Sequence, residues 1–138
     1  MMPAIDVVLP LPEELYMRLE QTARSTQQSL TDMLLRAVRA GSPPDWSQSP
    51  AVFQADLAAL DRLDDDTLWR IARSRRSEAD MTPLQELLEK NADDALTAQD
   101  RLDLESQIFE ADRFMLRKAH AAALLQWRGH AVPPFERL

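Results

Sequence analysis

The stretch Val7-Val8-Leu9-Pro10-Leu11-Pro12-Glu13-Glu14-Leu15 sets the expectation for how this chain begins to fold. Its apolar, β-branched start favours a short strand, whereas Pro12 and the two glutamates after it suit the first turn of a helix. A second helix is predicted from the Ser29 cap to Gly41. We therefore expect a strand over residues 5–11 that leads into two amphipathic helices.

A lone short strand needs a partner, because its backbone ladder groups otherwise stay unpaired. No second strand is predicted in this sequence, so we expect the strand to pair with its copy from a second chain. Alternation along the strand separates an inward from an outward set of side chains. The outward set contains Asp6, Val8 and Pro10, and none of them is basic. The inward set, which we predict to form the dimer contact, is Val7, Leu9 and Leu11.

This order of elements, together with the segment Leu11-Pro12-Glu13-Glu14-Leu15, resembles the ribbon-helix-helix fold of bacterial repressors and antitoxins. The resemblance implies a homodimer whose two-stranded ribbon can enter a DNA groove. Base edges are read by Arg, Lys, Asn or Gln side chains, which the outward ribbon positions lack. We therefore expect DNA binding by the protein alone to be weak or absent.

The charge of the chain also argues against broad contact with DNA phosphates. Sixteen basic and twenty-three acidic side chains give a formal net charge of −7. The first 66 residues carry five arginines and eleven acids, so the half expected to bind DNA is the more acidic one. Proteins that hold DNA by phosphate neutralisation carry the opposite sign. Attraction to a duplex would have to be local or come from another chain.

The rest of the sequence predicts a mainly α protein with three parts. Residues 1–41 form the ribbon-helix-helix-like dimerisation module, and residues 42–50, rich in proline and serine, form a linker. Residues 51–138 form a helical module. Its helices are expected near 52–63, 67–73 and 83–90, and a final long helix runs from Ala98 to Arg128. The apolar stripe of that last helix is broken early and nearly continuous late, so its second half is either buried or a surface for another chain.

The second half of the chain, roughly residues 60–134, resembles a family of small uncharacterised bacterial proteins. The resemblance rests on Leu68-Trp69-Arg70-Ile71-Ala72-Arg73-Ser74 and on residues 116–130, which include Ala121-Ala122-Ala123-Leu124-Leu125-Gln126-Trp127. Such proteins are often encoded beside small nuclease genes. The resemblance implies an antitoxin-like or adaptor role.

Tryptophan and arginine are the residues most enriched in binding hot spots, and they mark the predicted partner-binding surface. Arg70, Arg73 and Arg76 are spaced by three and would form one row. Two alternatives remain open: the arginines pair with acids of the same chain, and the two tryptophans pack together in a core. The predicted partner-binding residues are Trp69, Arg70, Arg73, Arg76, Leu116, Ala123 and Trp127.

Catalytic and metal chemistry find little support in this sequence. There is no cysteine, and the two histidines, His120 and His130, lie ten residues apart, which is not a metal-ligand spacing. Two glycines cannot build a phosphate loop or a nucleophile elbow. The run Asp64-Asp65-Asp66 is best explained as a helix cap. We expect no enzyme activity, no metal and no cofactor.

These patterns favour a homodimeric antitoxin-like or adaptor protein that binds a second protein. Because the chain is acidic, a basic nuclease is the expected kind of partner. The alternative is a ribbon-helix-helix transcriptional regulator that binds DNA. No apolar run approaches the length of a membrane span, and no signal peptide is predicted at the N-terminus. We therefore expect a cytoplasmic protein that does not enter the membrane.

Overall fold

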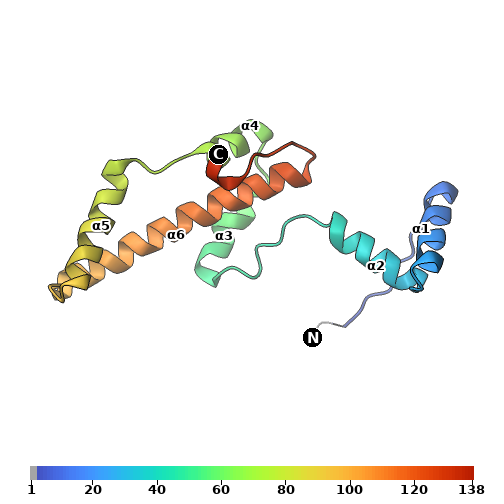
Figure 1. The fold of residues 1–138 in the computed structure, drawn as a ribbon, viewed down its shortest axis with the longest axis horizontal. Helices are drawn as coiled ribbons and strands as arrows, with labels where there is room; N and C mark the ends of the chain where they lie inside the picture. Colours follow the sequence, from blue (N-terminus) through green and yellow to red (C-terminus); the bar gives the residue numbers. More distant parts are fainter. Residues whose placement is uncertain (1–2) are drawn as a thin grey trace. The chain divides into compact units, whose positions relative to one another are not determined.

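The computed structural model describes residues 3–138, and in that range the chain is helical throughout. It divides into two compact units, Met1–Ser42 and Pro43–Leu138, which are described separately below. Figure 1 labels the elements in chain order. They are α1 (Glu13–Ser25), α2 (Leu30–Gly41), α3 (Ala51–Leu60), α4 (Asp65–Arg73), α5 (Glu78–Ala92), α6 (Ala98–Trp127) and a short 3-10 helix, η1 (Phe135–Arg137).

The predicted N-terminal strand is wrong. Residues 3–12 contain no strand, and no sheet occurs anywhere in residues 3–138. A strand requires a second backbone for its hydrogen bonds, and no other extended segment of the described chain supplies one; Pro10 and Pro12 also lack the N–H donor. The ribbon-helix-helix fold class is corrected accordingly. Of the residues predicted to form its dimer contact, Val7 and Leu9 are 81% and 67% exposed, and Leu11 is half-buried.

The first unit is a pair of helices with a very small core. The two helices contact each other, and the Ser29 side chain caps α2 by accepting a hydrogen bond from the Asp32 amide at 3.0 Å. Only Ala23 of α1 and Met33 of α2 are buried. The helices therefore form where local signals predict them, but little apolar surface holds them together.

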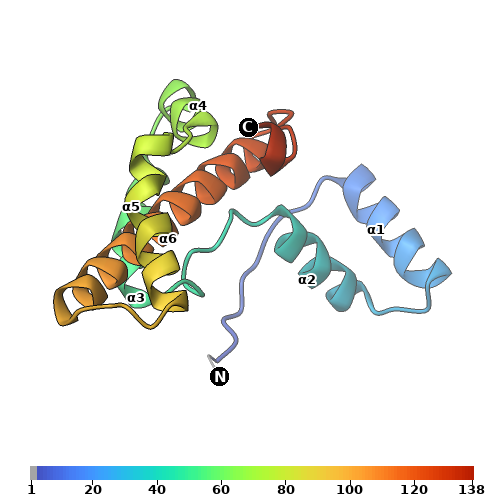
Figure 2. The same ribbon diagram turned by 60° about the vertical axis from the view of Figure 1, so that its left-hand side comes forward.

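The second unit has a continuous core built on α6, against which α3, α4 and α5 all pack. Its most buried large side chains are leucines, and each one contributes about 1.5–3 kcal/mol relative to an exposed position. Figures 1 and 2 show α5 beside the first half of α6, while α4 lies beside its second half. The buried cluster consists of Phe53, Leu57, Leu60, Leu68, Ala72, Ala121, Leu124 and Leu125.

Polar contacts join the turn between α3 and α4 to the end of α6. Asp61 accepts a hydrogen bond from the Trp46 indole N–H at 3.0 Å, and its other oxygen lies 2.7 Å from His120 Nε2. Asp65 contacts Arg128 at 2.8 Å and His130 Nε2 at 2.7 Å. Both histidines thus have carboxylate partners that fasten distant parts of this unit, and His120 is only 7% exposed.

Helix α5 is longer than the sequence patterns predict. It starts at Glu78, five residues before the expected start at Pro83, because Ser77 and Asp80 form a reciprocal capping box. Pro83 therefore lies inside the helix. The last helix, α6, follows its prediction closely and begins with a second capping box formed by Thr97 and Asp100.

None of the helices in the described part of the chain combines the length and the apolar character that crossing a membrane requires.

Candidate binding surfaces

Helix α4 presents Trp69 on the surface of the second unit. The Asp64 side chain caps this helix by accepting a hydrogen bond from the Thr67 amide at 2.8 Å, which confirms the capping role expected for the aspartate run. The helix buries Leu68 completely, so Trp69 next to it is only partly covered by the core. Arg73 stacks its guanidinium 4.4 Å above the Trp69 ring, a cation–π contact that orients both side chains.

The predicted row of Arg70, Arg73 and Arg76 is split between two places. Helix α4 ends at Arg73, and Ser74 after it is extended, so the three-residue spacing no longer keeps Arg76 on the same face. Arg73 stays with Trp69, whereas Arg70 and Arg76 line a neighbouring pocket. Sequence spacing alone could not show this, because it assumes a helix that continues.

The three predicted residues of α6 also differ in their surroundings. Leu116 packs partly against the core, and Ala123 lines a shallow hollow beneath residues 132–135. Trp127 is 49% exposed. The ring neighbours of Trp69 are Arg73 and His130, whose imidazole meets it edge-on at 6.0 Å between centroids. The late face of α6 is therefore partly a core element and only partly a surface.

The sequence analysis missed a surface on α5 and the first half of α6. Leu102 and Phe109 are two helical turns apart and share one side, as do Ile108 and Met115 on an adjacent side. Only α5 covers this part of α6 along most of its length, and Leu87 is the one buried residue among those described for α5. A seven-residue spacing of apolar side chains was the available signal. The exposed members of this surface are Met81, Leu88, Leu102, Ile108, Phe109 and Met115.

This helical hairpin, residues 78–112, is also strongly acidic. It carries eleven Asp and Glu side chains and only two basic ones, Lys90 and Arg101. The remainder of the second half is basic: residues 67–77 hold four arginines and no acid, and residues 113–138 hold five basic groups and one acid. The nearly neutral total of the second half hides this separation. The apolar surface of the hairpin is thus surrounded by carboxylates.

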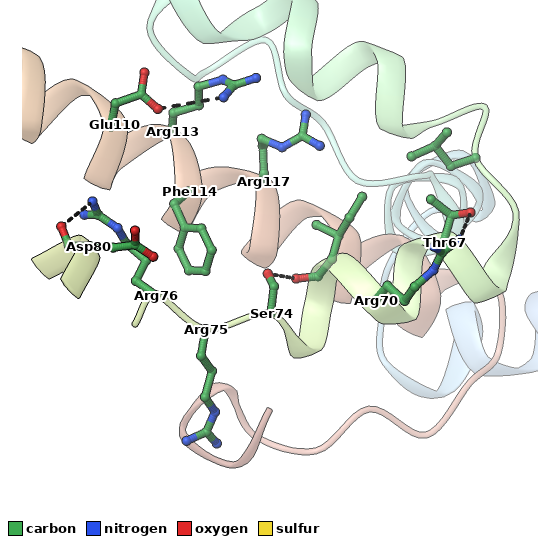
Figure 3. A pocket seen from close by; sticks show the side chains of 12 residues that line it. Thr67, Arg70, Ser74, Arg75, Arg76, Asp80, Glu110, Arg113, Phe114 and Arg117 are labelled. Carbon is green, nitrogen blue, oxygen red and sulfur yellow. Dashed lines mark hydrogen bonds and ion pairs between the residues drawn. The ribbon is translucent and has the colours of Figure 1, made fainter. Parts of the chain in front are cut away.

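A pocket of about 670 Å³ lies where the hairpin meets the basic part of the unit. Figure 3 shows its walls, which come from α4, the segment after it, the start of α5 and the middle of α6. Five arginines and two acids contribute to the lining. The full set is Leu63, Thr67, Arg70, Ile71, Ser74, Arg75, Arg76, Asp80, Glu110, Arg113, Phe114 and Arg117.

One of these arginines, Arg113, is neutralised by carboxylates. Its Nε donates a hydrogen bond to Asp56 Oδ2 at 2.6 Å, and Glu110 lies 3.9 Å away. The hydrogen bond from Arg113 lowers the pKa of Asp56 below its ordinary value, and Asp56 in turn raises the pKa of Arg113. Arg113 therefore serves chiefly to join α3 to α6.

The other four guanidiniums have no carboxylate within hydrogen-bonding distance in residues 3–138. Arg75 and Arg76 donate to the backbone oxygens of Leu138 at 2.9 Å and of Asp80 at 3.1 Å. Arg70 makes one long contact, 3.3 Å, with the Thr67 hydroxyl. Arg117 makes no hydrogen bond or ion pair within the described chain, although its charge helps to lower the pKa of Asp56.

Lys118 adds another cation behind this site. Its side chain is 6% exposed, its Nζ lies 3.5 Å from the Leu138 backbone oxygen, and it sits 5.0 Å from the centre of the Phe135 ring. Burial lowers the pKa of Lys118, and the nearby Arg75 lowers it further. The arrangement of cations around the pocket favours binding of an anion.

Metal ligation has a separate result: residues 3–138 contain no group of three or more His, Cys, Asp or Glu side chains placed to hold a metal ion.

Comparisons with protein-family models, with curated proteins and with solved structures find no match to this chain.

Proposed function

We propose that this protein is a non-enzymatic, homodimeric adaptor, antitoxin-like in its role, that binds a basic protein through its acidic helical hairpin. The observation that carries the proposal is the joint presence, on residues 78–112, of exposed apolar side chains and a large excess of carboxylates. A partner with a complementary positive surface would be attracted by the charge and held by the apolar contact. Nucleases that grip nucleic-acid phosphates have such surfaces.

The homodimer is proposed from the first unit. Its apolar side chains are mostly uncovered: Ile5, Val7 and Val8 are 83%, 81% and 98% exposed, and Val38 on α2 is 62% exposed. A two-helix unit of 42 residues that buries only two side chains gains stability if a second copy covers these groups. The contact proposed here is apolar packing and does not depend on a two-stranded ribbon.

A DNA-binding regulator is not retained as a second function. That alternative required the paired N-terminal strand, which residues 3–12 do not form. The one strongly basic feature, the arginine-lined pocket, lies instead beside the acidic hairpin.

Cross-linking tests the partner surface. A photo-reactive amino acid at Leu102 should capture a basic protein in cells, and the same group at Val52 is the matched control, because these side chains are 60% and 62% exposed and Val52 lies on α3. With the purified partner, Leu102→Ser should weaken binding at least tenfold and Val52→Ser should not. Binding should also weaken as salt is added.

An equal yield of the same product from both positions would contradict the proposed surface, and so would a captured partner that is acidic. For the homodimer, light scattering should give about twice the mass of one chain, and Leu9→Asp should lower that mass. A wild-type protein that stays monomeric at high concentration would remove the self-association part alone.

A further inference from the structure

We propose that the arginine-lined pocket binds a small organic phosphate with a flat apolar body, of the nucleoside monophosphate class. This ligand site goes beyond the proposed adaptor function, because it uses the basic part of the unit and not the acidic hairpin. Charge, lining and size each support it.

The charge argument starts from Arg70, Arg75, Arg76 and Arg117, which no carboxylate of the described chain neutralises within hydrogen-bonding distance. Guanidinium groups are planar forks that match two phosphate oxygens, and they keep their charge at all relevant pH values. Arg70 would lose only its 3.3 Å contact with Thr67 on turning toward a ligand, and Arg117 would lose no hydrogen bond. A bound dianion would also relieve the repulsion among these cations.

The lining argument concerns the uncharged side chains. Leu63, Ile71 and Phe114 contribute apolar surface to the same pocket. Figure 3 shows the Phe114 ring extending from α6 into the space between Arg76 and Ser74. An aromatic ring beside arginines is a suitable surface for stacking a planar ring. The pocket therefore offers one place for a phosphate and another for an organic body.

Size and surroundings favour a small ligand over a polymer. A volume of about 670 Å³ lies in the range typical of small-molecule sites and is far larger than a bare phosphate needs. Asp80 and Glu110 stand at the edge where the acidic hairpin begins. A nucleic-acid strand leaving the pocket on that side would meet these carboxylates, whereas a compact dianion would not extend to them.

Calorimetry on the full-length protein tests the site with three probes: adenosine 5′-monophosphate, inorganic phosphate and adenosine. We expect saturable binding of the monophosphate, at least tenfold weaker binding of inorganic phosphate, and no binding of adenosine. The double variant Arg70→Gln/Arg117→Gln should weaken the monophosphate at least tenfold. Arg101→Gln, an exposed arginine of α6 outside the pocket, should leave its affinity unchanged.

A second variant separates the two parts of the ligand. Phe114→Leu keeps an apolar side chain but removes the ring, so it should weaken the monophosphate several-fold and leave inorganic phosphate unaffected. The site is refuted if the wild-type protein shows no saturable binding, if adenosine binds as well as its monophosphate, or if Arg101→Gln weakens binding as much as the double variant. Preference for a single-stranded oligonucleotide or an acidic peptide over the monophosphate would equally overturn it. Far-ultraviolet circular dichroism checks that each variant is folded.

These results do not bear on the partner surface. Loss of the phosphate site would leave the Leu102 cross-link intact, and loss of the cross-link would leave phosphate binding intact.

Discussion

The two units of this chain form helices equally well but differ in what holds the helices together. In the first unit, capping and periodicity produce α1 and α2, and only Ala23 and Met33 are buried. In the second unit, eight buried side chains from three helices form one cluster. Helix formation is a local property, whereas stability comes mainly from apolar surface removed from water. The comparison teaches that the first unit depends on other contacts for its stability.

The largest expected effect follows from separating the units. Residues 43–138 alone should keep their helical circular dichroism and unfold cooperatively with heat, because their core is complete. Residues 1–42 alone should lose most of their helix at low micromolar concentration, since isolated short helices are marginal in water. Helicity that returns as the concentration rises would agree with self-association. A stable monomeric fragment 1–42 would break the comparison.

A smaller effect is expected from matched truncations of leucine in the two units. Leu68 on α4 is fully buried, and Leu68→Ala should lower the free energy of unfolding by about 2–5 kcal/mol. Leu35 on α2 is 48% exposed, and Leu35→Ala should change it by less than about 0.5 kcal/mol in the monomer. Urea titrations of full-length protein measure both. Similar losses at the two positions would show that the first unit has a larger core than it buries here.

The smallest effect concerns pH and sharpens the comparison through the polar contacts of the second unit. Hydrogen bonds from Arg128 and then His130 hold the pKa of Asp65 below its ordinary value. A carboxylate with a lowered folded-state pKa stabilises the protein above its unfolded pKa of about 4, and that contribution is lost as pH falls through the folded pKa. Asp65→Asn should therefore lower the melting temperature at pH 7 and make little difference near pH 2.

The control for this pH experiment is Asp66→Asn. Asp66 is the exposed neighbour in the same first turn of α4, and Asn keeps its shape. It should leave the melting temperature at pH 7 nearly unchanged. If both variants behave alike, the contribution belongs to the helix dipole and not to the contacts with Arg128 and His130.

The amino-acid sequence alone determined the helices of this protein, because helix signals lie within a few residues of one another. Ser29 and Thr97 cap the helices that were predicted to follow them, and the long last helix ends where Gly129 and the prolines after it require. The better burial of its second half was also readable from its apolar stripe. Helix α5 was mislocated at its start because a proline was taken for a boundary, although a capping box lies five residues earlier.

Only the tertiary structure decided the rest. A strand depends on a second backbone, which no local pattern guarantees, and the segment before Pro12 has none within the described chain. The end of α4 at Arg73 divided the predicted arginine row, since side-chain direction follows the backbone and not residue spacing. The pocket collects Arg70 and Arg117 from helices far apart in sequence, and the folding of α5 onto α6 gathers eleven acids on one hairpin. Sequence order therefore specifies the elements, and their packing places the charges together.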